Sequence, residues 1–319
     1  MRNILVLGGT GFVGRAVCEH LSERCSSGTL TVPTRRAAHG NAVRLLPTVQ
    51  VVPADVHDEA ALARLVAGHD AVINLVAILH GSAAAFDQVH VQLPRRLAQA
   101  CRQAGVRRLL HVSALGVGAD VASAPSNYLR SKTAGEHVLE QAGLQLTMFR
   151  PSVIFGAEDS LLNLFAKLQA LAPVMPLAGS DARFQPVWVD DVARAIVTAL
   201  DRADSIGKTY ECTGPTVYTL SELVRLAGRW SGHERPQIPL PEFIGRLQAL
   251  AMELLPGQPL MSRDNVDSMK RPNVATGALP GLADLGITPT ALEAVAPDYL
   301  GPRHGRARLE KLRAGAGRG

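Results

Sequence analysis

The chain has 319 residues, of which 47% are hydrophobic, and this fits a folded protein of one large α/β domain or two domains. The formal net charge of +5 lies in residues 301–319, so the rest of the chain is about neutral and a general nucleic-acid-binding surface is excluded. The four cysteines form no C-x-x-C pair and the ten histidines show no ligand spacing, so we expect neither a disulfide framework nor a metal site. No signal peptide is evident, which indicates a cytoplasmic protein.

The chain begins with a short apolar run, residues 4–7, that leads through glycines into a helical pattern at residues 12–24. This context, strand then turn then helix, is the one that a dinucleotide-binding turn requires. Gly8 allows a tight turn, Gly11 lets the backbone approach a pyrophosphate, and Gly14 lets the helix pack close to the strand. The alternative is a glycine-rich connection without a ligand. The predicted contacts here are Gly8, Thr10, Gly11, Phe12, Val13 and Gly14.

A second strand, residues 29–36, ends in Arg35 and Arg36. A carboxylate at this position would hold the ribose 2′-hydroxyl of NAD and repel a 2′-phosphate, whereas a guanidinium pairs with that phosphate. The sequence therefore favours NADP(H), with NAD(H) as the alternative. Both arginines could also be solvated loop residues without a ligand.

The third strand, residues 49–56, ends at Asp55 and Val56, where an adenine ring could rest. Asp55 could equally cap the following helix, residues 59–67. The fourth strand, residues 70–79, should direct its carboxyl end toward the cofactor, because ligands of open α/β sheets lie beyond the strand ends. The residues expected at that end are Leu75, Val76 and Ala77.

A long helix is expected over about residues 86–104, then a fifth strand within residues 106–116, with Ser113 near its end. A helical pattern over residues 126–143 follows. Strands and helices thus continue to alternate, as in a doubly wound parallel sheet.

Tyr128 and Lys132 are four residues apart and therefore share one face of that helix. Their placement after Ser113 predicts general acid–base chemistry. The Lys132 ammonium would lower the pKa of the Tyr128 phenol and touch the nicotinamide ribose. Tyr128 would pass a proton to a substrate oxygen that Ser113 holds by a hydrogen bond. The alternative is a packed tyrosine beside a solvated lysine.

The sixth strand and its turn, residues 144–156, place Pro151 and Val153 to form a wall of the nicotinamide site. We therefore expect an NAD(P)-binding Rossmann domain over residues 1–156. A smaller C-terminal lobe on the substrate side, residues 157–300, is interleaved with it. The arginine-rich tail, residues 301–319, would lie on anionic lipid or on an acidic partner, or else be a solvated terminus.

Together these motifs resemble an atypical, extended member of the short-chain dehydrogenase/reductase superfamily. They are GGTGFVG, the Asp55-Val56 pair, Ser113, Tyr128-Leu-Arg-Ser-Lys132, RPSVIFG and QPVWVDDVA. More narrowly, residues 1–300 resemble the group named after the NADPH-binding accessory subunit of respiratory complex I, with its bacterial relatives.

The resemblance implies a Rossmann domain with bound NADP(H) and acid–base roles for Ser113, Tyr128 and Lys132. Two features depart from an active enzyme of the superfamily. The fourth strand reads NLVAIL where extended members have a His-x-Ala-Ala-like ending. The mitochondrial member of the subgroup is regarded as a nucleotide-binding structural subunit, and some relatives are linked to ubiquinone metabolism.

Two functions are therefore expected. The first is an NADPH-dependent oxidoreductase acting on a small carbonyl or quinone-like substrate. The alternative is a non-catalytic NADPH-binding accessory protein of a respiratory or ubiquinone-synthesis complex, peripheral on the inner face of the membrane. A nucleotide-sugar epimerase or dehydratase ranks lower, because residues 157–300 show no diphosphate-sugar clamp. The helices near 86–104 and 126–142 could pair in a homodimer or stay solvated.

Overall fold

The computed structural model describes residues 3–24, 28–118, 120–254 and 261–301, and the predicted role of the basic tail lies outside them. The chain divides into two compact units. Among the described residues, the first comprises those up to 152 together with 189–213 and 275–288, and the second comprises those in 153–188, 214–274 and 289–301.

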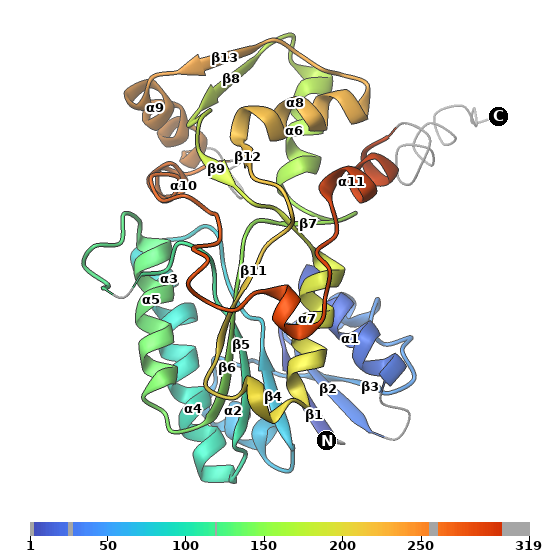
Figure 1. Cartoon of the computed structure of the whole chain (residues 1–319). Helices are drawn as coiled ribbons and strands as arrows, with labels where there is room; N and C mark the ends of the chain where they lie inside the picture. The colour runs from blue at the N-terminus through green and yellow to red at the C-terminus, as the bar shows by residue number, and fades with distance from the viewer. Residues whose placement is uncertain (1–2, 25–27, 119, 255–260, 302–319) are drawn as a thin grey trace, which may run out of the picture. The chain divides into compact units, whose positions relative to one another are not determined.

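The first unit is built on a seven-stranded parallel sheet, which confirms the predicted doubly wound α/β fold (Figure 1). The strand order is β11-β6-β5-β4-β1-β2-β3. Chain order runs in opposite directions from the β1–β4 pair, so the carboxyl ends of these two strands form the switch point where such sheets bind ligands. The strands are β1 (Asn3–Leu7), β2 (Thr29–Thr34), β3 (Val49–Pro53), β4 (Ala71–Asn74), β5 (Arg108–Val112), β6 (Gln145–Pro151) and β11 (Thr209–Cys212).

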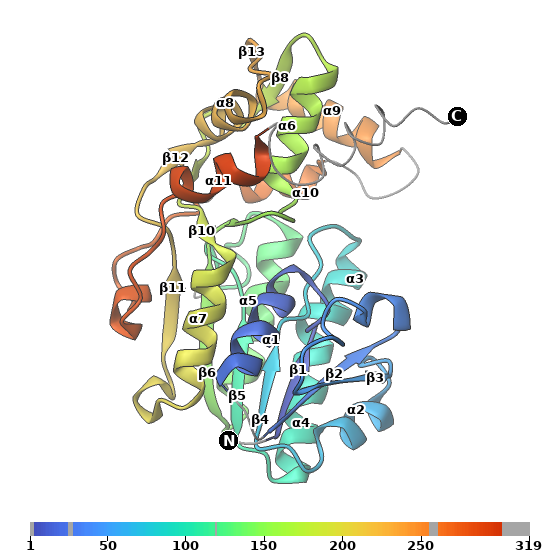
Figure 2. The same ribbon diagram turned by 90° about the vertical axis from the view of Figure 1, so that its right-hand side faces the viewer.

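Helices cover both faces of this sheet, with α2, α4 and α5 on one face and α1 and α7 on the other (Figures 1 and 2). The helices of this unit are α1 (Phe12–Arg24), α2 (Glu59–Val66), α3 (Ala83–Asp87), α4 (Leu93–Ala104), α5 (Asn127–Glu140) and α7 (Val189–Leu200). Short 3₁₀ turns lie at Ala37–Gly40, Ala203–Ser205 and Leu282–Leu285. The apolar strand residues are buried because helices cover both sides. One core cluster includes Leu5, Leu7, Leu62, Val72, Leu97 and Leu109.

The helix expected over about residues 86–104 is present as a continuous helical segment, residues 83–104, in which a π-helical turn at Gln88–Gln92 lies between α3 and α4. Pro94 stands in the first turn of α4. Proline has no N–H to donate to the carbonyl four residues earlier, and its ring crowds that carbonyl. The carbonyl concerned is that of His90, within the widened turn.

The first unit also takes in segments that the sequence analysis placed in the C-terminal lobe. β11 pairs with β6 in parallel, with Thr209 opposite Met148, and completes the sheet. Helix α7 packs on α1. The second unit begins at Val153 and is formed by three separate stretches of the chain.

The second unit contains pairs of short strands and a helical cluster. Its elements are β7 (Ile154–Phe155), α6 (Leu161–Leu171), β8 (Met175–Ala178), β9 (Arg183–Phe184), β10 (Val187–Trp188), β12 (Tyr218–Thr219), α8 (Leu220–Ser231), β13 (Gln237–Leu240), α9 (Glu242–Glu253), α10 (Arg263–Ser268) and α11 (Leu292–Leu300). Its core joins α6, α8 and α11 through Phe165, Leu223 and Ala296. Among the helices of the described segments, none has the length and apolar character needed to span a bilayer.

Candidate cofactor and acid–base site

The glycine turn after β1 has the conformation and the close packing that were predicted for it. Gly8 has φ +80°, a left-handed conformation that side chains disfavour. A Cβ at Gly14 would lie 2.2 Å from the Gly8 carbonyl oxygen and 2.5 Å from Gly9 Cα. Helix α1 can therefore approach the turn this closely only because residue 14 has no side chain.

The beginning of α1 offers backbone N–H groups. The first bond along the helix runs from Arg15 N–H to the Gly11 carbonyl at 2.9 Å, so the preceding N–H groups lie at the open helix end. These belong to Phe12, Val13 and Gly14. Gly11 is exposed and Thr10 is partly exposed. A glycine cradle at a helix N-terminus fits a diphosphate.

The segment after β4 lies against this turn, as expected for the switch point. Leu75 N–H donates to the Leu7 carbonyl at 2.9 Å. A Cβ at Gly8 would stand 3.1 Å from the carbonyl carbon of Leu75 and 3.2 Å from Val76 N. Ala77, which follows, is exposed. The structure thus brings the predicted residues of β1, α1 and β4 together.

Arg35 and Arg36 follow β2 and are both exposed. The Thr34 hydroxyl donates to the Arg36 carbonyl at 3.1 Å and closes the turn that presents them. Within the described segments, neither guanidinium is held by a hydrogen bond or ion pair to the protein. Both side chains are therefore available to an anion.

The end of β3 differs from one sequence expectation. Asp55 does not cap the next helix; its Oδ1 accepts the His57 N–H at 3.0 Å. The cap of α2 is Asp58, whose Oδ1 accepts from Ala61 N–H at 2.7 Å, because the helix starts three residues later than a cap at Asp55 would require. Val56 packs against the core cluster of the sheet.

Sequence reasoning missed His57. Its Nδ1 is buried and has no hydrogen-bond partner in the part of the chain that is described. Burial lowers the pKa of His57, Asp55 opposes this change, and the charges of Arg35 and Arg96 lower the pKa further. His57 is thus a neutral side chain near Arg35, which follows β2.

Ser113 comes directly after β5 and is buried. Its N–H donates to the Phe149 carbonyl at 2.7 Å and extends the pairing of β5 with β6. Its Oγ has no hydrogen-bond partner among the described residues. A buried hydroxyl without a partner is costly, and such groups are found where a ligand completes the bonding.

Helix α5 carries Tyr128 in its first turn and Lys132 one turn later. Lys132 is buried, and its Nζ donates to the carbonyl of Val112, the residue before Ser113, at 3.2 Å. Burial lowers the pKa of Lys132 to about 8, and Glu136 opposes this. The structure therefore brings the lysine to the strand end that holds Ser113.

The expectation that Lys132 lowers the pKa of Tyr128 is wrong for this structure. Burial raises the pKa of the Tyr128 phenol to about 12. A phenol with this pKa stays protonated near neutral pH.

Asn74 and His111 form a polar contact beneath this site that the sequence analysis did not identify. Asn74 Nδ2 donates to His111 Nδ1 at 3.1 Å, and Asn74 Oδ1 accepts the Val76 N–H at 3.2 Å. Burial, with the charge of Lys132, lowers the pKa of His111 to about 3. A neutral histidine on β5 thus fixes the backbone after β4.

Pro151 ends β6 and is buried, and its carbonyl accepts the Leu115 N–H at 2.9 Å. It therefore lies beside the segment that follows β5. Val153 belongs to the second unit, where its N–H donates to Asn273 Oδ1 at 3.0 Å. The pairing of these two residues at a nicotinamide site stays a prediction.

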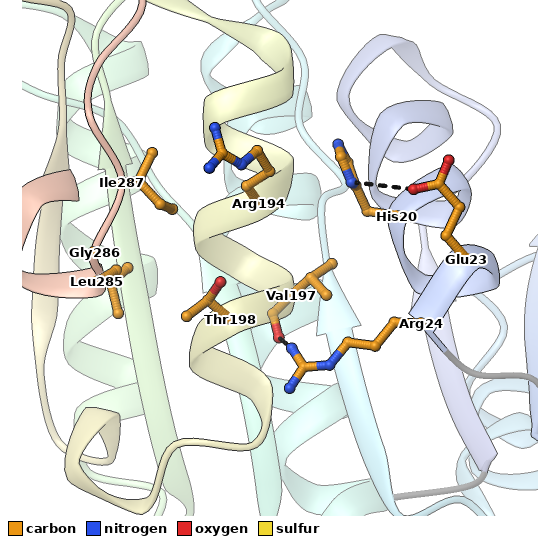
Figure 3. Close-up of a pocket in the computed structure, with 9 residues that line it drawn as sticks. All are labelled: His20, Glu23, Arg24, Arg194, Val197, Thr198, Leu285, Gly286 and Ile287. Carbon is orange, nitrogen blue, oxygen red and sulfur yellow. Dashed lines mark hydrogen bonds and ion pairs between the residues drawn. The ribbon is translucent and has the colours of Figure 1, made fainter.

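A separate hollow of about 370 Å³ lies over α1, α7 and residues 285–287 (Figure 3). Its ionic side chains are paired within the protein. His20 Nε2 lies 2.6 Å from Asp190 Oδ1, and Arg24 lies 3.0 Å from Asp201. None of the predicted site residues lines this hollow. In the described segments, no group of three His, Cys, Asp or Glu side chains is arranged to bind a metal.

Comparisons with known proteins show which family and fold the chain resembles. Residues 4–213 match the model of the NAD dependent epimerase/dehydratase family. NADH dehydrogenase (ubiquinone) 1 alpha subcomplex subunit 9, mitochondrial, of Mus musculus is 34% identical over 294 residues, which cover 90% of this chain and 77% of that protein. The Escherichia coli NADPH-dependent quinone oxidoreductase complexed with NADPH has a TM-score of 0.74 at 22% identity, covering 92% of this chain and 98% of that one. A Streptomyces venezuelae dTDP-glucose 4,6-dehydratase with NAD bound has a TM-score of 0.72 at 23% identity, covering 98% and 100%.

Proposed function

The chain belongs to the NAD dependent epimerase/dehydratase family, and on that premise we propose that it is an NADPH-dependent oxidoreductase that reduces a carbonyl or quinone-like substrate. The observation that carries the proposal is the Ser113 hydroxyl, which is buried and without a partner among the described residues. It lies beside the backbone carbonyl that binds Lys132. A substrate oxygen would complete its hydrogen bonding.

The coenzyme would be held by groups at the switch point. The N–H groups at the start of α1 and the glycine turn suit its diphosphate. Arg35 and Arg36 suit a 2′-phosphate because their guanidinium groups are exposed and free of ion pairs in the described part of the chain. Asp55 and Val56 would adjoin the adenine. When bound, the nicotinamide supplies a hydride.

The side chains of the protein supply the proton and the orientation. Tyr128, with a pKa raised to about 12 by burial, is a donor of a proton to the reduced oxygen. Ser113 donates a hydrogen bond to the same oxygen and so fixes its position. Lys132, whose pKa burial lowers to about 8, keeps most of its positive charge at pH 7 and stabilises negative charge that develops there. The quinone-like class is suggested by the printed name of the Escherichia coli protein of similar fold.

Coenzyme exchange tests the proposal. We expect NADPH to leave the purified protein within seconds, and NADH to bind at least about tenfold more weakly, because a bidentate guanidinium–phosphate contact is a strong charge-assisted bond. A double variant, Arg35→Ala with Arg36→Ala, should remove this preference and leave NADH binding unchanged. Stopped-flow fluorescence of the reduced nicotinamide measures the release rate of NADPH and the affinities for NADPH and NADH. Release of NADPH over hours, or equal binding of NADH, would contradict the proposal.

A second function is favoured by a specific surface, the apolar stripe of α9, which we define as Phe243, Leu247, Leu250 and Leu254. These positions repeat at i, i+4, i+7 and i+11 and so share one face. The opposite side packs on β8, where a Cβ at Gly245 would lie 2.4 Å from the Ala178 Cβ. Phe243, Leu247 and Leu254 are 72%, 65% and 79% exposed. Contiguous exposed apolar surface marks an interaction site.

The charges around α9 select a protein partner rather than an anionic bilayer. Arg246 pairs with Asp267, Arg263 lies 3.0 Å from Glu253, and Lys270 lies 2.8 Å from Glu242. These cations are already neutralised, so little positive charge is left for lipid headgroups. We propose that the stripe binds a subunit of a membrane-associated respiratory or quinone-synthesis complex at the inner face of the membrane. The printed name of the mouse relative, a subunit of NADH dehydrogenase (ubiquinone), supports the respiratory complex.

Leu247→Glu tests this second function. The substitution places a charge in the middle of the stripe, and we expect it to reduce recovery of the protein with its complex by about tenfold or more. The matched control is Leu45→Glu, since Leu45 is 87% exposed but belongs to the first unit, away from the stripe in sequence. Blue-native gels of membranes solubilised with mild detergent provide the measurement. Equal recovery of both variants and the wild type would contradict a docking role for α9.

A further inference from the structure

His90 is buried in the π-helical turn, and both of its ring nitrogens are used. Its Nε2 accepts the backbone N–H of Ile78 at 3.2 Å, so this nitrogen carries no proton. The other nitrogen, Nδ1, lies 2.9 Å from Ser131 Oγ. Since Nε2 is the acceptor, Nδ1 carries the proton and donates it to the serine hydroxyl.

The Ser131 hydroxyl in turn binds Tyr128, the residue proposed as the general acid. Ser131 Oγ donates to the backbone carbonyl of Tyr128 at 2.9 Å. A series of hydrogen bonds, each with a defined donor, thus runs from Ile78 through the imidazole and Ser131 to Tyr128. Ile78 follows the residues after β4 that lie against the glycine turn. These hydrogen bonds therefore connect the segment expected at the coenzyme with the first turn of α5.

Ring packing adds a second restraint on the Tyr128 side chain. The His90 ring meets the Tyr128 ring edge to face, with centroids 5.6 Å apart and planes at 84°. Phe86 stacks on the imidazole with ring centroids 5.6 Å apart and also meets the Tyr128 ring in an edge-to-face contact at 6.0 Å. The three rings, from α3, the π-helical turn and α5, therefore form one packed cluster.

The backbone at His90 is fixed against α5 as well. Pro94 cannot donate to the His90 carbonyl, which instead faces Gly135 of α5. A Cβ at residue 135 would lie 1.9 Å from that oxygen, so only glycine allows the approach. π-Helical turns of this kind occur frequently at functional sites.

The charges near the imidazole keep it in one protonation state. Burial, together with Lys132 and His111, lowers the pKa of His90 to about 2. His90 is therefore neutral at every physiological pH, and the Ile78 N–H selects one tautomer. A neutral ring with a fixed tautomer is suited to hold geometry and not to transfer protons.

We propose that His90 is a positioning residue whose imidazole, through Ile78 and Ser131, holds the Tyr128 hydroxyl in register with the coenzyme segment after β4. This inference rests on the proposed reductase function and deepens it. His90 touches neither substrate nor coenzyme in this account. It acts through the backbone of α5 and through the edge-to-face contact with the phenol.

Two variants separate the connections. Ser131→Ala removes the bond to the Tyr128 carbonyl and keeps the imidazole. His90→Asn keeps a donor near Nδ1 and removes the ring. We expect each to lower kcat by about 10–100-fold with a change in NADPH Kd below about twofold, since misplacement of the acid slows the chemical step and leaves coenzyme binding intact. The matched control is His137→Asn, in the last turn of α5. A kcat equal to wild type in both variants would overturn the proposal.

A second readout does not depend on turnover. In full-length protein labelled with 3-fluorotyrosine, the ¹⁹F resonance that disappears in Tyr128→Phe identifies Tyr128. We expect His90→Asn to lower the pH midpoint of this resonance, because water reaches a phenol that the imidazole edge covered, and His137→Asn to leave it in place. An unchanged midpoint in His90→Asn would overturn the positioning role. If the wild-type protein reduces no carbonyl or quinone, the reductase proposal fails separately, and the ¹⁹F result still decides the role of His90.

Discussion

Tyr128→Phe is expected to lower kcat for NADPH-dependent reduction by about 10²–10⁴-fold, the usual contribution of a positioned general acid. Burial raises the pKa of the phenol to about 12, so the proton stays on the oxygen at neutral pH and is available for transfer. The residues that we expect to hold the coenzyme lie in the turn after β1 and after β2, β3 and β4. The Kd for NADPH should therefore change by less than about twofold.

The control for this prediction is Tyr210→Phe. Tyr210 is 1% exposed, lies on β11 of the same unit and stacks on Phe149 with ring centroids 5.9 Å apart. Tyr210→Phe loses the same atom but keeps the ring that stacks on Phe149, the residue whose carbonyl accepts the Ser113 N–H, so we expect wild-type kinetics. Steady-state oxidation of NADPH and fluorescence titration give kcat and Kd in one set of samples. If Tyr128→Phe turns over as the wild type does, the proton comes from another group and the assignment of Tyr128 is wrong.

The sequence predicted the parts of the site whose signals are local. The order of strand, glycines and helix is readable in adjacent residues, and the structure gives Gly8 a positive φ and Gly14 its close contact. The carboxyl ends of parallel strands meet at one edge whatever the side chains, so placing Leu75 beside the turn needed only the topology.

Features that depend on contacts between distant residues could not be predicted in this way. His90 looked like one of several scattered histidines, because its partners Ile78 and Ser131 are 12 and 41 residues away in the chain. The lowered pKa expected for Tyr128 considered only the nearby Lys132 charge, whereas burial raises the pKa of the phenol. The π-helical turn was not predicted either. Pro94 leaves the His90 carbonyl without its usual helical donor, and the close contact of that carbonyl with Gly135 joins residues far apart in the chain.

Gly135→Ala is expected to destabilise the protein by about 2 kcal/mol or more, although the same change in an open helix stabilises by about 1 kcal/mol. Gly135 lies inside α5, where alanine is the better helix former. The Cβ of alanine would lie 1.9 Å from the His90 carbonyl oxygen, and the nearest atoms are backbone that cannot rotate away. Relief requires α5 to move from the π-helical turn, so the substitution should also loosen the bond between His90 and Ser131.

Ala134→Gly, one residue earlier on the same helix, makes the reverse exchange without a backbone atom in its way. It should cost only the helix preference of alanine, about 1 kcal/mol. Urea unfolding followed by circular dichroism measures the free energy of unfolding for both variants. At residue 135 helix preference predicts a higher free energy of unfolding for alanine, and the contact with His90 predicts a lower one. The sign of the change therefore decides between the two effects. A Gly135→Ala protein that is more stable than the wild type would mean that α5 and the turn at His90 are not in close contact. The geometry assigned to His90 would then be wrong as well.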